Sequence, residues 1–238
     1  MTRTVVFVAV CLLFALLTDV HAQISIPGGD NPGAPDPVEK LGDNLFRLGA
    51  IRVDTAKREA SVTGKVNPDT TVLEFIANTK NGFRAYESAF ELDANGLTFN
   101  LAMILIGLDN KNAVLPRFHF DPDPPQGDPV EVWVEWKAGN DTRRLRAEEL
   151  LWDKEKMERF PRSQWVYTGS ILLDDGRYRA DLDAVLIGFV HDPSSVIEWA
   201  GANGVGRFGF VQIDPKLGLV PGTALTVIVK AIGAPAKD

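Results

Sequence analysis

The sequence predicts an α+β fold in which a predominantly antiparallel β-sheet carries one buried helix at about 97–108 and one or two short helices. Apolar and polar residues alternate over many short segments, which is the period of half-buried strands. Asn, Gly and Pro residues separate these segments, as expected for turns. One apolar run follows helical spacing instead. These observations favour a single layered domain.

Alternation marks the strands in chain order. Residues 72–77 and 85–92 are expected to form a hairpin turned at Lys80-Asn81-Gly82, because Asn-Gly tolerates the positive φ of tight turns. The clearest strand is Val130 to Lys137, which alternates apolar and mostly charged side chains. Further strands are expected at 46–48, 51–54, 60–66, 165–173, 178–190, 207–213 and 224–231.

The apolar residues between 97 and 108 recur at helical spacing, and the polar segment 93–96 supplies start residues. This helix is apolar almost all round, so we expect it to be buried against the sheet. Short helices are expected at 147–157, where charged residues surround a few leucines, and at 194–199.

The first 22 residues are typical of a cleavable signal peptide. Arg3 supplies a positive charge, Val5 to Leu17 form an unbroken apolar stretch, and cleavage is expected between Ala22 and Gln23. Thirteen apolar residues span only ~20 Å as a helix, short of the ~30 Å hydrocarbon core, so an uncleaved anchor is the minority alternative. The sequence therefore predicts an exported protein, periplasmic or extracellular and soluble after cleavage.

Cys11 lies inside the predicted signal, so the mature chain is expected to have no thiol and no disulfide. A net charge of −7 argues against a nucleic-acid partner. No second apolar run reaches the length of a membrane span. Residues 23–44 are rich in Pro and Gly and are expected to form a flexible spacer, 45–232 the globular domain and 233–238 a loose tail.

Catalytic and metal-binding patterns are weak. His119 and His191 lie in no recognisable nucleophile context, and no zinc spacing occurs. Carboxylate clusters at 121–128 and 174–183 lack the pattern of a calcium loop, so we expect no metal and no cofactor. The aromatic residues Trp133, Trp136, Trp152, Trp165 and Tyr167 fit either a core or a ligand-binding face.

Several segments together resemble the YdjY-like domain family of bacterial exported proteins, over roughly residues 46–230. The matching segments are Leu73-Glu74-Phe75, Tyr86-Glu87-Ser88, 101–107, 130–136, 143–150, Trp165-Val166-Tyr167-Thr168-Gly169-Ser170 and His191-Asp192-Pro193. The resemblance implies no established activity. It points to Glu87, Ser88, Thr168, Gly169, Ser170 and His191 as the candidate ligand or functional site. Cysteine motifs of some relatives are missing here, so a cluster-binding role does not carry over.

The leading hypothesis is an exported, non-enzymatic binding domain whose partner is an envelope protein or a small ligand. One alternative is an envelope hydrolase or other enzyme that uses Glu87, His119 or His191. It requires these side chains to converge in one pocket. Another alternative, suggested only by the relatives, is an accessory partner of an electron-transfer protein.

Overall fold

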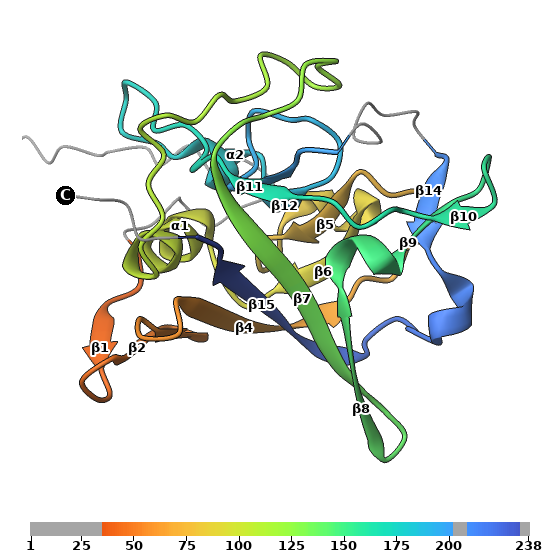
Figure 1. The fold of residues 1–238 in the computed structure, drawn as a ribbon, viewed down its shortest axis with the longest axis horizontal. Coiled ribbons are helices and arrows are strands. Elements are labelled where there is room, and N and C mark those ends of the chain that lie inside the picture. The colour runs from red at the N-terminus through yellow and green to blue at the C-terminus, as the bar shows by residue number, and fades with distance from the viewer. Residues whose placement is uncertain (1–34, 202–208, 234–238) are drawn as a thin grey trace, which may run out of the picture.

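The computed structural model describes residues 35–201 and 209–233, and most of its regular structure is β-strand (Figure 1). The predicted signal peptide at 1–22, its cleavage site, the spacer up to residue 34 and the tail from residue 234 lie outside these described residues. The domain boundaries therefore stay a prediction. The first described strand, β1 (Val38–Lys40), falls within the segment 23–44 and pairs with β2 (Leu45–Leu48).

Eight strands close into a barrel, which corrects the prediction of an α+β fold built on a predominantly antiparallel sheet with a buried helix. Around the barrel each strand bonds to the next, and the last bonds to the first. Their order is β4 (Glu59–Val66), β15 (Ala224–Ala231), β7 (Asp128–Ala138), β11 (Trp165–Tyr167), β13 (Ile197–Trp199), β12 (Val185–Gly188), β5 (Phe75–Asn78) and β6 (Ser88–Leu92).

Closure depends on β4, whose one edge pairs with two different strands. Residues 59–62 of β4 pair with β3 (Ile51–Asp54), and residues 64–66 pair with β6. The other edge pairs with β15 along residues 59–65. Gly64 lies at the point where the edge passes from β3 to β6, and a Cβ there would overlap the backbone oxygen of Glu91 and lie 2.7 Å from Leu92 Cδ2. Glycine therefore permits the close approach that seals the barrel.

The predicted hairpin of 72–77 and 85–92 is wrong, because β5 and β6 are parallel. A 3-10 helix, η1 (Phe83–Glu87), leads the chain back to the start of β6. The turn itself does contain a left-handed residue, Asn81, at φ 55°. A second parallel pair joins β12 and β13. These two parallel pairs make the sheet mixed.

Helix α1 (Gly96–Leu105) lies at the end of the barrel where β15 ends and β7 begins (Figure 1). It is buried on one face only, through Phe99, Ala102 and Met103, whereas Ile104 is 50% exposed. Its first turn is capped by the Asn95 side chain, which accepts a hydrogen bond from Thr98 N at 2.7 Å. The helix therefore covers the barrel end rather than packing as a buried layer on an open sheet.

The remaining elements extend the barrel. The helix expected at 147–157 is present only as the short η2 (Ala147–Leu150), and the helix expected at 194–199 is wrong, because this segment is a turn followed by β13 at Ile197–Trp199. No helix in the described part of the chain is both long and apolar enough to cross a bilayer. The other elements are β8 (Asp141–Arg146) on β7, the small sheet of β10 (Glu158–Arg159), β9 (Leu151–Asp153) and β14 (Val211–Ile213), and the helices α2 (Arg179–Leu182) and η4 (Pro215–Leu217).

Arg58 links the C-terminal end of α1 to Gly233 through hydrogen bonds, and its replacement is expected to lower the stability of the fold. Its Nε and Nη2 donate to the oxygens of Ile106 (3.1 Å) and Gly107 (3.0 Å), and its Nη1 donates to Gly233 O (2.5 Å). A cation beside free carbonyls at a helix C-terminus is stabilising. We expect Arg58→Met to lower the free energy of unfolding by about 1–2 kcal/mol, measured by urea denaturation. Arg177→Met, which removes an exposed ion pair, should stay near wild type.

Candidate functional site

His119 lies between two buried carboxylates in an arrangement that we call the His119 bridge, made of Glu74, His119 and Asp192. His119 Nε2 lies 3.0 Å from Glu74 Oε2, and Nδ1 lies 2.8 Å from Asp192 Oδ2. Glu74 and Asp192 are 4% and 5% exposed, whereas the His119 side chain is 35% exposed. The bridge therefore joins the surface to a buried pair of acids.

Three separate segments position the bridge. Glu74 immediately precedes β5, and its backbone oxygen accepts hydrogen bonds from Phe189 N and Val190 N after β12. Asp192 follows in the same loop. His119 comes from the long connection between α1 and β7, which is held to that loop by Phe120 N donating to His191 O at 2.8 Å. The bridge thus fastens this connection to the barrel wall.

Both carboxylates stabilise the charged imidazole. Hydrogen bonds to Asp192 and then to Glu74 raise the pKa of His119 to about 9, against the opposing effect of partial burial. For Asp192, burial raises the pKa, but the hydrogen bonds from His119 and Ser194 outweigh it and leave the pKa below its usual value. At neutral pH the bridge is an imidazolium between two carboxylates, and both ring N–H groups are donated to them.

A second ion pair lies beside the bridge. Arg84 Nη1 contacts Glu87 Oε1 at 2.5 Å, and Arg84 Nε donates to Asp183 O at 3.1 Å. The Phe75 ring connects the two groups, because its centroid lies 5.3 Å from Arg84 Cζ and 6.3 Å from the His119 ring. Carboxylates and cations therefore alternate across this part of the barrel wall.

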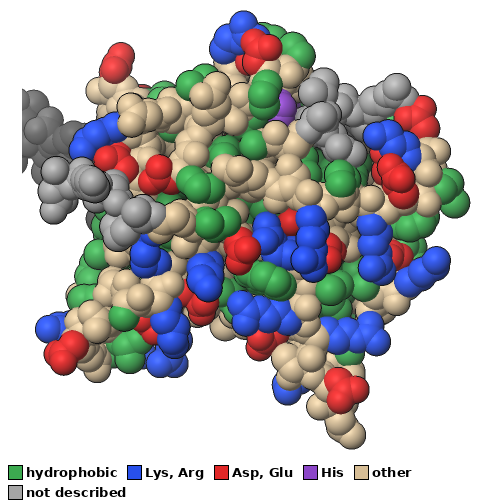
Figure 2. Space-filling model, in the orientation of Figure 1, with side chains coloured by type: hydrophobic (Ala, Val, Ile, Leu, Met, Phe, Trp, Pro, Cys, Tyr) green, Lys and Arg blue, Asp and Glu red, His purple; other side chains and the backbone are tan. Residues whose placement is uncertain are grey.

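Exposed aromatic rings flank these charges. Phe83, Tyr86 and Phe118 are 47%, 58% and 52% exposed. Arg84 Cζ lies 5.7 Å from the Phe83 ring, and Phe118 precedes His119 in the chain. Burial, then the charge of Glu87 and a hydrogen bond to it, raise the pKa of Tyr86. Figure 2 shows a histidine side chain at the surface beside hydrophobic side chains.

A buried polar layer lies next to the bridge. Glu198 is fully buried, and this burial raises the pKa of its carboxyl well above the usual value. Its Oε1 accepts a hydrogen bond from Asp192 N at 3.3 Å. Glu198 Oε2, Ser195 Oγ and His191 Nε2 have no hydrogen-bond partner in the described part of the chain. Buried polar atoms of this kind are commonly satisfied by ordered water.

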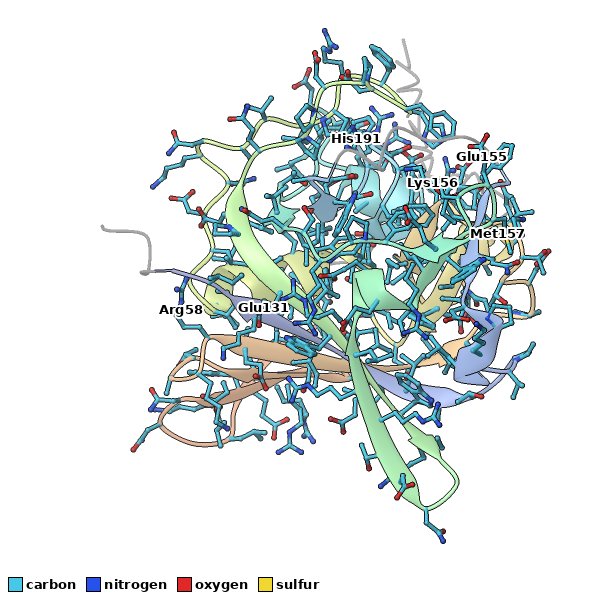
Figure 3. The ribbon with its side chains drawn as sticks, turned by 45° about the vertical axis from the view of Figure 1, so that its right-hand side comes forward. Arg58, Glu131, Glu155, Lys156, Met157 and His191 are labelled. Atoms are coloured by element: carbon cyan, nitrogen blue, oxygen red, sulfur yellow. The ribbon has the colours of Figure 1, made fainter. Side chains whose placement is uncertain are left out.

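His191 and the segment 168–170 have supporting contacts. His191 is 1% exposed, and its Nδ1 donates to Asp121 O at 2.6 Å; Figure 3 shows it inside the body of the molecule. Thr168 Oγ1 donates to Ser195 O at 3.0 Å, and Ser170 Oγ donates to Ser194 O at 2.7 Å. Gly169 adopts a φ of 76°, and a Cβ on it would meet Asn110. These residues hold the 191–196 loop in place.

Glu87 and Ser88 lie at the start of β6. Glu87 is 4% exposed and paired with Arg84, while Ser88 is fully buried and its Oγ has no partner among the described residues. The backbone links Glu87 to the bridge, because Glu74 N donates to Glu87 O at 2.9 Å. The candidate residues are therefore linked to the bridge through backbone contacts or the 191–196 loop. That they form a binding site remains a prediction.

Sequence reasoning missed Glu74, Asp192 and Arg84 as partners. Glu74 had a usable signal, since it is a lone acid within the apolar run Val72-Leu73-Glu74-Phe75-Ile76. A carboxylate in such a run is buried and needs a cation. The sequence around Asp192 and Arg84 contains no comparable indication that these side chains form ion pairs. The partners of His119 are 45 and 73 residues away, as the positions 74, 119 and 192 show.

The arrangement limits the chemistry available to His119. With both nitrogens donating, the ring has no lone pair for a proton or a metal until it loses a proton. Among the described residues no group of three or more His, Cys, Asp or Glu side chains is placed to hold a metal ion. Exposed rings near the buried carboxylates instead offer apolar faces together with hydrogen-bond acceptors.

The fold and the site define a small β-barrel domain with a carboxylate–imidazolium–carboxylate bridge on its wall. The family model of the YdjY domain matches residues 51–180, more than half of the 238 residues. The chain belongs to the YdjY domain family, which confirms the resemblance read from the sequence. Comparison with curated proteins and with solved structures gives no match.

Proposed function

We propose that this YdjY-family chain is an exported, non-enzymatic binding or interaction domain that engages its ligand at the His119 bridge and the aromatic rings beside it. The observation that supports the proposal most directly is the one-third exposed imidazolium between Glu74 and Asp192. The signal-like N-terminus and the Pro/Gly-rich segment behind it support export. The ligand would be a small envelope molecule or a protein side chain.

The rings and the carboxylates suggest the ligand class. Phe83, Tyr86 and Phe118 provide flat faces for an apolar or planar group. In the neighbouring ion pairs, the three acids Glu74, Glu87 and Asp192 outnumber the two cations Arg84 and His119. A ligand with a planar or apolar face and hydrogen-bond donors, such as a sugar or an amine, fits this combination.

The enzymatic alternative is less well supported by the geometry. A general base needs a free lone pair and a pKa near the operating pH. His119 has both nitrogens occupied and a pKa raised to about 9, and Glu87 is paired with Arg84. His191 is buried with Nδ1 bound to the backbone. Support for an accessory role in electron transfer comes from relatives alone.

The binding proposal is tested with two probes of different chemistry, chitotetraose as a neutral sugar and pentalysine as a polyamine. We expect one of them to shift the amide NMR signals of residues 83–87 and 118–120, with a Kd in the range of about 1 mM or tighter. Tyr86→Ala should abolish these shifts without lowering the Tm, because Tyr86 is 58% exposed.

The matched control is Val220→Ala, which removes an apolar side chain that is 61% exposed in the turn before β15. It should bind each probe as the wild type does. Binding that survives Tyr86→Ala unchanged, or shifts that spread over unrelated surface, would argue against this site.

A further inference from the structure

The strand β8 is an unpaired edge that projects from the barrel with β7 (Figure 1). It pairs with β7 from Trp133↔Arg146 to Ala138↔Asp141 and with no other strand among residues 35–201 and 209–233. Beyond that pairing, no backbone group of residues 141–145 bonds to another backbone group in the described part of the chain. One side of β8 therefore presents free N–H and C=O groups, which is a template for an added strand.

Arginine dominates this edge. Arg143 and Arg144 have no carboxylate within 4.0 Å among the described residues, although Glu135 lies opposite Arg144 in the register. Arg143 donates only to Leu217 O, at 3.4 Å, and Arg144 lies 5.0 Å from the Trp133 ring. Arg146 differs, because Glu131 and Glu148 bind it at 2.9 and 3.2 Å. Two guanidinium groups thus remain available.

Nearby cations extend the positive charge. Lys137 donates to Thr142 Oγ1 at 2.6 Å, and Lys216 lies 5.7 Å from the Trp152 ring, close to the segment that Arg143 contacts. Figure 2 shows Lys and Arg side chains gathered on this face over β7, β8 and the segment that follows. The whole chain has a net charge of −7, so a positive strand edge is a local exception. Glu131, seen on β7 in Figure 3, is already paired.

We propose that β8 binds an extended acidic segment of another protein, which adds to the sheet as a strand beside β8. The free backbone groups require a strand, and the unpaired Arg143 and Arg144 require carboxylates on it. A second copy of this chain fits poorly, because two β8 edges would bring these arginines together.

The test uses the full chain and the peptide acetyl-Val-Glu-Glu-Val-Glu-Glu-Val-amide as the probe, which carries carboxylates on both faces of a strand because Arg143 and Arg144 lie on opposite faces of β8. We expect binding that weakens as salt rises and that slows amide hydrogen exchange at residues 141–145. The double variant Arg143→Glu/Arg144→Glu should bind about tenfold more weakly or worse. Its Tm should fall only slightly, because both side chains are exposed although Arg144→Glu places a like charge opposite Glu135. The peptide with Lys in place of Glu should not bind.

The matched control is Lys111→Glu, a charge reversal at a side chain that is 84% exposed outside this hairpin. It should leave peptide binding unchanged. The proposal is overturned if the double variant binds as the wild type does, or if binding leaves the exchange of residues 141–145 unaffected. It is also overturned if dextran sulfate binds at β8 while the peptide does not, since that result assigns the arginines to a polyanion.

Discussion

Replacing His119 by asparagine is expected to lower the free energy of unfolding by about 2 kcal/mol at neutral pH. Removing one member of a buried charge group leaves its partners buried and unpaired, which usually lowers the free energy of unfolding by more than this amount. We expect a smaller loss of unfolding free energy here because the His119 side chain is 35% exposed and its charge is partly screened by solvent. Urea denaturation of wild type and variant measures the difference.

The difference in unfolding free energy between the wild type and His119→Asn should decrease as the pH rises. The folded pKa of His119 is about 9, above the unfolded value of 6.5, so the folded state holds the proton more tightly. The stability that this provides is complete below about pH 6.5 and is lost as pH rises through about 9. Wild type and His119→Asn should therefore converge in alkaline buffer. A gap that is equally large above pH 9 would contradict the bridge.

Lys111→Asn is the control for this experiment. Lys111 lies in the same connection and pairs with Asp109, but its side chain is 84% exposed. Exposed pairs contribute about 0–1 kcal/mol. The control should show neither the loss nor the convergence. Equal losses for both variants would mean that any cation in this segment suffices.

Gly64→Ala is expected to lower the free energy of unfolding by about 2–3 kcal/mol, since added volume at a close-packed contact forces the backbone apart. A Cβ at residue 64 would overlap Glu91 O and approach Leu92 Cδ2 to 2.7 Å. The strain falls on the β4–β6 pairing that closes the barrel. Amide hydrogen exchange should therefore accelerate in residues 88–92 more than in β15.

Gly42→Ala is the matched control, because a Cβ there would make only ordinary contacts of 3.7 and 3.9 Å with Leu45. It should leave stability close to wild type. If Gly64→Ala were equally well tolerated and left the exchange of β6 unchanged, the tight closure at residue 64 would be wrong.

The local pattern of apolar and polar residues was sufficient to predict several strands and the helix α1. Alternation over Val130 to Lys137 lies within β7, and the helix expected at about 97–108 overlaps α1, which ends at Leu105. Both patterns arise from neighbours in the chain, so one sequence displays them. The helix predicted at 194–199 was wrong, because β13 is only three residues long and so short an apolar run fits the period of a helix as well as that of a strand.

The closure of the barrel and the partners of His119 could not be predicted from the sequence, because both depend on contacts between segments that are far apart in the chain. The parallel pairing of β5 with β6 and the division of the β4 edge join strands by position in space. The same holds for His119, whose carboxylate partners come from other segments. The resemblance named Glu87 and His191 as candidate residues, and in the structure their own contacts are with Arg84 and the backbone. Buried charge pairing follows from the tertiary fold.

The most direct test of the central claim is an NMR titration of the histidine ring signals, with His119 assigned by comparison with His119→Asn. The bridge predicts that His119 titrates near pH 9 and carries both ring protons at neutral pH, held by Asp192 and Glu74. A His119 pKa near the unperturbed value of about 6.5 would contradict it. In that case the ring would not lie between two ionised carboxylates, and the proposed binding site would lose its central feature.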